Sequence, residues 1–77
     1  MATEERAREV FRRNSHRLMR QPGVAGVGVE RDSGGGFLIA IHLATHDPDV
    51  RAGLPDVIEG CPVRVDYSGP FRKLPSD

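Results

Sequence analysis

The sequence predicts a single α+β domain in which helices cover one face of a small sheet. Three observations lead to this prediction: an apolar stripe of helical period near the start, two alternating stretches around a glycine-rich loop, and a third such stretch further on. The expected order of elements is α-β-β-α-β. Because domains commonly contain about 50–200 residues, the 77 residues form one domain. It consists of a helix over 3–20, a sheet with a short helix over 24–67, and a tail over 68–77.

The first helix is predicted over residues 3–20. Thr3 is suited to the N-cap, acidic residues follow it, and Pro22-Gly23 ends the helix. One face repeats at the spacing of an amphipathic helix. It consists of Ala7, Val10, Phe11, Asn14 and Leu18, of which Asn14 is the polar interruption.

Residues 24–31 and 37–44 alternate with the period of a strand, and Asp32–Gly36 between them has the composition of a hairpin loop. In the first strand, the alternation predicts that Ala25, Val27 and Val29 share one face. In the second, Phe37, Ile39, Ile41 and Leu43 face the core. The opposite sheet face then carries Gly26, Gly28, Glu30, Leu38, Ala40, His42 and Ala44.

Asp47-Pro48 predicts the start of a short helix over 48–52, which Gly53 and Pro55 end. Residues 54–60 are expected to be a turn-rich bridge that Val57 and Ile58 anchor to the core. Residues 61–67 predict a third strand, which begins at an edge or bulge because Pro62 cannot donate a ladder hydrogen bond. Phe71 and Leu74 are the residues that could hold the tail.

The balance of 11 basic and 11 acidic residues, with 38% hydrophobic residues, argues against intrinsic disorder. No run of about 18 apolar residues is present, so no membrane span is expected. The charged start lacks the pattern of a signal peptide, and Cys61 is the only cysteine. Small secreted domains usually contain several disulfides, so these features predict a cytoplasmic protein.

No catalytic, cofactor-binding or small-molecule site is predicted. Gly23, Gly26 and Gly28 do not have the spacing of a dinucleotide fingerprint, and they lie in a strand that follows a helix. Asp32-Ser33-Gly34-Gly35 is similar to the surroundings of a peptidase nucleophile, but the chain is too short for the trypsin fold. An enzyme would therefore require a site shared between subunits, for which His42, Cys61 and Asp66 are the candidates.

A metal site is not expected either. His42, His46, Asp47 and Cys61 are suitable ligand types. However, His42 lies in a strand and His46 lies beyond its end, about 13 Å away at strand spacing. Structural histidines and a buried Cys61 are the simpler interpretation.

The first helix is rich in arginine. Glu4 can pair with Arg8, and Glu9 with Arg12 or Arg13, as on an ordinary solvated helix face. The alternative is nucleic-acid binding, although the net charge is zero and no aromatic residue is interleaved. The candidate phosphate contacts are Arg6, Arg12, Arg13, Arg17 and Arg20.

The run QPGVAGVGV over 21–29, followed by LPDVIEGCPVRV over 54–65 and by Gly69, resembles a small bacterial domain. That domain has a "pGVxGVGV" strand and an "LPxxIxGxPVxV" ending. It precedes trypsin-like serine peptidase domains and also occurs in short stand-alone proteins. The resemblance covers about residues 18–69. It implies an α+β fold and an accessory role in a peptidase system, and it carries over no catalytic residue.

The interpretation that we favour is a non-catalytic interaction module. A domain of this size without disulfides or metal is marginally stable, and association is a common remedy. The sheet face opposite the helices is predicted to be flat and nearly uncharged at its centre. A homodimer is expected first, and a protein partner such as a peptidase second. The interface candidates are Gly26, Gly28, Leu38, Ala40 and His42.

Overall fold

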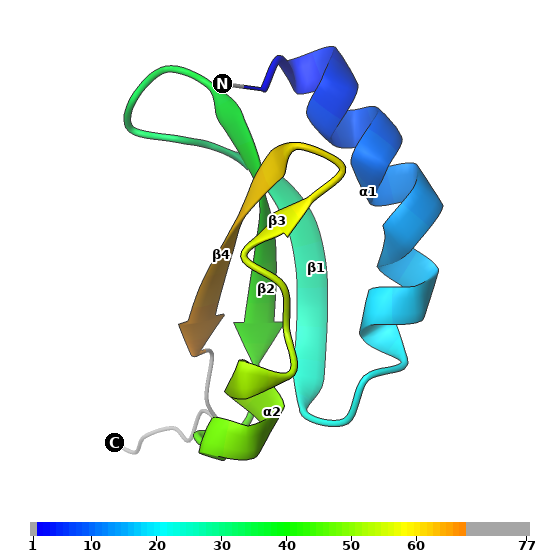
Figure 1. Cartoon of the computed structure of the whole chain (residues 1–77), viewed down its shortest axis with the longest axis vertical. Coiled ribbons are helices and arrows are strands. Elements are labelled where there is room, and N and C mark those ends of the chain that lie inside the picture. The colour runs from blue at the N-terminus through cyan, green and yellow to red at the C-terminus, as the bar shows by residue number, and fades with distance from the viewer. Residues whose placement is uncertain (1, 68–77) are drawn as a thin grey trace, which may run out of the picture.

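Helix α1 (Glu4–Met19) and a four-stranded mixed sheet form the two layers of the molecule (Figure 1). The computed structural model describes residues 2–67. The predicted α+β class is confirmed, with one more short strand than expected. The other elements are β1 (Val24–Arg31), β2 (Phe37–Leu43), α2 (Pro48–Ala52), β3 (Val57–Ile58) and β4 (Cys61–Tyr67). The predicted tail over 68–77 lies outside the described residues.

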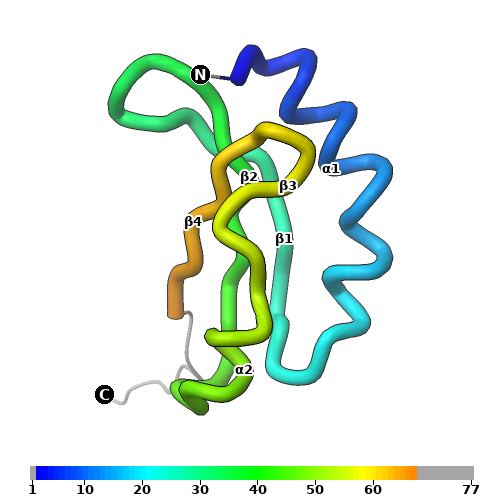
Figure 2. Tube along the Cα trace, viewed as in Figure 1, coloured from blue at the N-terminus to red at the C-terminus, as the bar shows by residue number. Residues whose placement is uncertain are grey.

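The strand order is β1-β2-β4-β3. β1 and β2 form an antiparallel hairpin, β2 pairs with β4 in parallel, and β3 pairs antiparallel with β4. The chain leaves β2, passes through α2 and rises past β2 to the β3–β4 turn, as the tube in Figure 2 shows. β2 is therefore the centre of the three long strands, paired on both sides.

Helix α1 begins and packs as predicted. The Thr3 hydroxyl accepts a hydrogen bond from the Arg6 N–H at 3.1 Å, which caps the first turn. The buried stripe of Ala7, Val10, Asn14 and Leu18 faces the sheet, and Phe11 is partly buried beside it. The helix covers one sheet face, mostly over β1. The core lies between α1 and the inward residues of the sheet, chiefly Ile39, Ile41, Leu43, Leu54, Ile58 and Cys61.

Strand β1 corrects one predicted residue. A bulge interrupts the register between Val24 and Gly26, so Ala25 is the extra residue. Val24 instead of Ala25 packs against the core, followed by Val27 and Val29, while Ala25 is exposed. Strict alternation along the strand could not predict this change of face.

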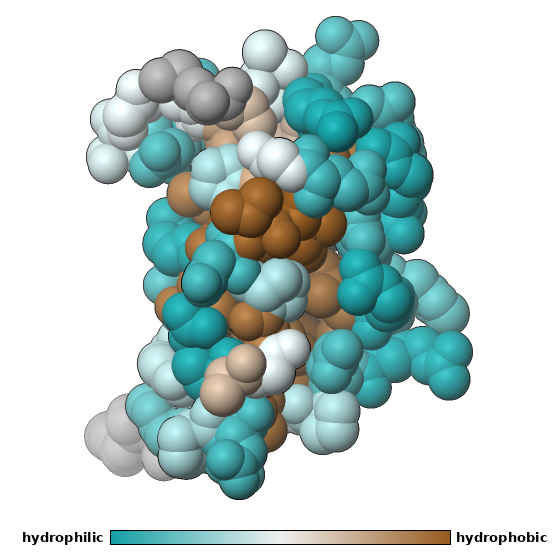
Figure 3. Space-filling view, viewed as in Figure 1, coloured by the Kyte–Doolittle hydropathy of each residue, from teal (hydrophilic) through white to brown (hydrophobic). Residues whose placement is uncertain are grey.

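The predicted bridge over 54–60 contains β3, a strand that was not expected from the sequence. Val57 pairs with Pro62 and Ile58 with Cys61, and the turn Glu59-Gly60 connects them. Ile58 anchors this segment to the core as predicted, together with Leu54, whereas Val57 is 56% exposed. In the space-filling view, hydrophobic side chains gather around β3, while the outer side of α1 is hydrophilic (Figure 3).

The short helix α2 has the predicted bounds. The Asp47 carboxylate accepts a hydrogen bond from the Asp49 N–H at 2.9 Å, and Pro48 stands at the first helical position. Val50 packs near Gly23, where the chain enters β1. The helix thereby closes the end of the sheet at which β1 begins and β2 ends.

Candidate functional site

The sheet face that α1 does not cover contains the predicted interface residues. In the register of the sheet, Gly26 lies beside His42 and His42 beside Asp66. In the next row, Gly28 lies beside Ala40 and Ala40 beside Arg64. We call these rows, together with Glu30 and Leu38, the helix-free face.

Four titratable side chains connect the three strands across this face. Arg64 of β4 forms an ion pair with Glu30 of β1, reaching across β2, and its Nε donates to Asp66 at 3.0 Å. The second carboxylate oxygen of Glu30 lies 3.5 Å from Nε2 of His42. The two carboxylates raise the pKa of Arg64, mainly through the hydrogen bond to Asp66 and then the one to Glu30. The prediction that the centre of this face is nearly uncharged is therefore wrong.

The alternation of residues along the predicted strand over 61–67, which is β4, could have indicated part of this network. Because Val63 and Val65 face the core, alternation puts Arg64 and Asp66 on the opposite face. What the sequence could not provide is the parallel pairing of β2 with β4, which brings Arg64 beside Ala40.

The five interface candidates differ in accessibility. Ala40 is 0% exposed and Leu38 is 5% exposed, so the chain itself already buries both. This corrects the expectation that they present a flat surface to a partner. Gly26, Gly28 and His42 remain partly exposed. The accessible candidates are therefore Gly26 and Gly28 of β1 and His42 of β2.

Gly28 is not required by the fold of a single copy. A Cβ at this position would meet nothing within 4 Å, and at Gly26 it would meet only a His42 carbon at 4.0 Å. Neither residue has a positive φ, so the backbone does not need glycine. Glycine inside a strand lowers stability by roughly 0.5–1 kcal/mol relative to alanine.

β1 is the terminal strand of the sheet, so no strand within residues 2–67 pairs with its outer edge. On the core side, Val27 and Val29 stay partly exposed, whereas Ile39 and Ile41 in β2 are at most 1% exposed. Helix α1 packs over this side of β1 and leaves these two valines partly exposed. The strand is thus incompletely covered at its edge and on both of its faces.

The arginines of α1 are divided between internal contacts and solvent. Arg6 and Arg13 bind carboxylates, and the Arg17 side chain donates to Asn14. Arg8 pairs with Glu4 at 2.9 Å, as predicted. Among the described residues, Arg12 and Arg20 form no ion pair. The structure therefore leaves fewer of the candidate phosphate contacts free than the sequence suggests.

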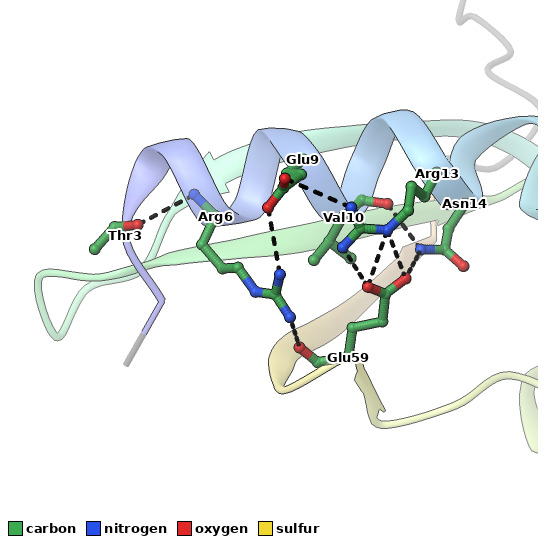
Figure 4. Close-up of polar contacts among 7 residues, drawn as sticks. All are labelled: Thr3, Arg6, Glu9, Val10, Arg13, Asn14 and Glu59. Carbon is green, nitrogen blue, oxygen red and sulfur yellow. Dashed lines mark hydrogen bonds and ion pairs between the residues drawn. The ribbon is translucent and has the colours of Figure 1, made fainter.

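Glu59 in the β3–β4 turn is the residue on which these contacts converge (Figure 4). Its carboxylate accepts hydrogen bonds from Arg13 and, at 2.9 Å, from the Asn14 amide, and its carbonyl accepts one from Arg6 at 3.0 Å. The Arg13 hydrogen bond, followed by that of Asn14, lowers the pKa of Glu59 to about 2. No sequence signal predicted this contact, because Arg13 and Glu59 are 46 positions apart.

The candidate catalytic and metal-binding residues are brought together only in part, because His42 lies beside Asp66 and Cys61 is on the other face of the sheet. Cys61 is buried in the core, where burial raises the pKa of its thiol, while His42 and Asp66 lie on the other face of the sheet. His46 instead stacks on Tyr67, with ring centroids 4.3 Å apart. Within residues 2–67, no group of three or more His, Cys, Asp or Glu side chains is arranged to hold a metal ion.

No helix among the described residues is long and apolar enough to cross a membrane. Comparisons of this chain with protein-family models, with curated proteins and with solved structures give no match. The resemblance to domains that precede serine peptidases therefore remains a prediction from the quoted residues.

Proposed function

We propose that this domain is a non-catalytic interaction module that self-associates through β1 and the adjoining part of the helix-free face. The observation that carries the proposal is the incomplete covering of β1. Val27 and Val29 remain partly exposed on one side, and Gly28 leaves open space on the other. Both features cost a single copy stability, and contact with a second surface would compensate for them.

A second copy of the chain is the expected partner. The net charge of zero removes long-range repulsion between copies. On the helix-free face, Glu30 of β1 is paired with Arg64 of the same copy, so it does not present an unpaired charge to a second copy. Closed two-fold dimers are the commonest oligomers, and a small domain without a disulfide gains stability from association.

The substitution Gly28→Glu tests this proposal. The structure of one copy has room for the new side chain, so the monomer should fold with its stability changed by about 1 kcal/mol or less. Self-association should weaken at least about fivefold, because the new charge would face a like charge on the second copy. Sedimentation velocity over a concentration series measures both the wild-type and variant dissociation constants.

Val57→Glu provides the matched control. It adds the same charge at an exposed position of β3, at the opposite end of the strand order. This variant should associate like the wild type. A wild-type protein that stays monomeric up to millimolar concentration, or a Gly28→Glu variant that associates unchanged, would contradict the proposal.

A further inference from the structure

The outer edge of β1 defines how two copies could meet. We propose that the β1 strands of two copies pair antiparallel about a two-fold axis near Gly28, so that the two sheets become one continuous sheet. This inference rests on the proposed self-association, and it specifies the contact. Strand addition at a sheet edge is a recurrent mode of protein recognition.

The direction of the backbone groups follows from the hairpin. The Asp32 N–H donates to the Gly36 carbonyl at 2.7 Å, in register with the β1–β2 ladder. Hydrogen-bonded and non-hydrogen-bonded pairs alternate in an antiparallel ladder. Consequently Gly26, Gly28 and Glu30 direct their N–H and C=O groups toward β2. Val27, Val29 and Arg31 direct theirs outward.

An independent contact supports this alternation. The Phe37 N–H donates to the Ala2 carbonyl at 2.9 Å, on the side of β2 away from β1. Its register partner Arg31 must therefore also point its backbone groups away from β2. The outward groups of Val27 and Val29 lie where a second strand would pair with them.

The two edges of the long-stranded part of the sheet differ in protection. β4 carries Pro62, Arg64 and Asp66, the kinds of residue that discourage pairing at an edge. From Val24 to Val29, β1 contains neither proline nor charge. The bulge at its first residues leaves the rest of the strand regular. Within residues 2–67, β1 is therefore the long edge best suited to accept another strand.

Antiparallel pairing also suits the charges. The only charged residues of β1 are its last two, Glu30 and Arg31. Antiparallel strands related by an axis near Gly28 put Glu30 beside Gly26 of the partner subunit, so like charges do not meet. Val27 then lies beside Val29 of the partner subunit. The partly exposed valines of the two copies cover one another on the α1 side.

Amide hydrogen exchange of the wild-type protein tests the contact directly. At concentrations where sedimentation shows dimers, the amides of Val27 and Val29 should exchange at least about tenfold more slowly than in dilute monomer. Freely exchanging Val27 and Val29 amides in a demonstrated dimer would overturn the strand pairing and leave self-association standing. Absence of any dimer would instead overturn the proposed function itself.

Two variants provide a second readout. Gly28→Gln adds a neutral side chain that points out of the sheet plane, so strand pairing should survive within about fivefold. The same side chain would block a contact made by packing the helix-free faces of two copies together.

Val29→Pro removes an outward N–H that β2 does not use, and should give a folded monomer. A Val29→Pro variant that dimerises like the wild type, or loss of association in Gly28→Gln, would contradict the inference. If Val29→Pro does not fold, hydrogen exchange of the wild-type Val27 and Val29 amides decides whether the two β1 strands pair.

Discussion

Glu59 has a left-handed backbone conformation, with φ of 51°, that glycine or asparagine adopts more readily. Its side chain explains what glutamate contributes there. The carboxylate reaches from the β3–β4 turn to Arg13 and Asn14 of α1, so it connects two segments that are distant in sequence. An amide–carboxylate contact also satisfies Asn14, the one polar residue buried in the helix stripe.

This contact predicts an acid-dependent loss of stability. The pKa of Glu59 falls from 4.5 to about 2 in the folded protein, chiefly because of the Arg13 hydrogen bond. A carboxylate with a depressed pKa stabilises the fold fully above its unfolded pKa, and this stabilisation disappears as the pH falls from 4.5 through about 2. Thermal unfolding from neutral pH to about pH 2 should therefore show a steeper decline for the wild type than for Glu59→Gln.

The comparison between the two proteins isolates Glu59, because all other carboxylates titrate in both. The variant should melt at lower temperature at neutral pH, and the two melting temperatures should converge in acid. Parallel curves across this range would show that the Glu59 carboxylate does not stabilise the fold.

At the scale of elements, hydrophobic period and capping residues were sufficient for α1, β1, β2, α2 and β4. The signals for these elements are local: Thr3 caps its own helix, and Pro48 begins the next. The features that the sequence did not reveal are non-local. The bulge at Ala25 depends on the pairing with β2, and β3 exists only because Val57 and Ile58 meet β4.

The properties of the candidate site also separate into those that depend on local sequence and those that depend on non-local pairing. The accessibility of Gly26 and Gly28 follows from alternation along one strand. The burial of Leu38 and Ala40 depends on β4 lying in parallel beside β2, with Arg64 crossing to Glu30. Nothing in a single sequence specifies which strand becomes the neighbour of another.

The connection between α1 and β1 gives an element-scale prediction. Gly23 has φ of +85°, and a Cβ there would lie 2.8 Å from Cγ2 of Thr45 and 3.1 Å from Cγ1 of Val50. Gly60 has a similar φ of +81° with nothing within 4 Å. Gly60→Ala should cost about 1–2 kcal/mol from backbone strain alone. Gly23→Ala should cost a further 1–3 kcal/mol or so from overpacking.

Urea unfolding of the two variants measures the difference between them. Since φ is nearly the same at both glycines, any excess loss in Gly23→Ala reports the packing of Thr45 and Val50 against the start of β1. Equal losses would mean that Thr45 and Val50 move aside without cost.

At the scale of the whole molecule, the sheet has two unlike faces. One faces α1 and forms the core, and the other is covered by side chains that cross between strands, Arg64 above all. The small residues at the centre of the second face are thus part of the folded structure of one copy. The margin along β1 stays accessible to another molecule, as do the side chains of Arg64 and Asp66 on β4.

The difference in burial between Ala40, at the centre of the helix-free face, and Gly28, at its margin, can be tested by the stability of the monomer. Ala40→Arg should lower the free energy of unfolding by more than 2 kcal/mol or so, because it forces a charge into a position with 0% exposure. Gly28→Glu in the same row should leave the unfolding free energy nearly unchanged. Denaturant titrations at low protein concentration compare the two; similar stabilities would refute this description of the face.

The buried thiol of Cys61 can report local opening of the folded domain. The thiol is 0% exposed where β4 begins, between the core and the β3–β4 hairpin, and its raised pKa keeps it protonated. A thiol reagent can reach it only when the hairpin separates from α1 or the whole domain unfolds. The rate of labelling consequently measures that opening, which we expect to become faster when the contact of Glu59 with α1 is lost.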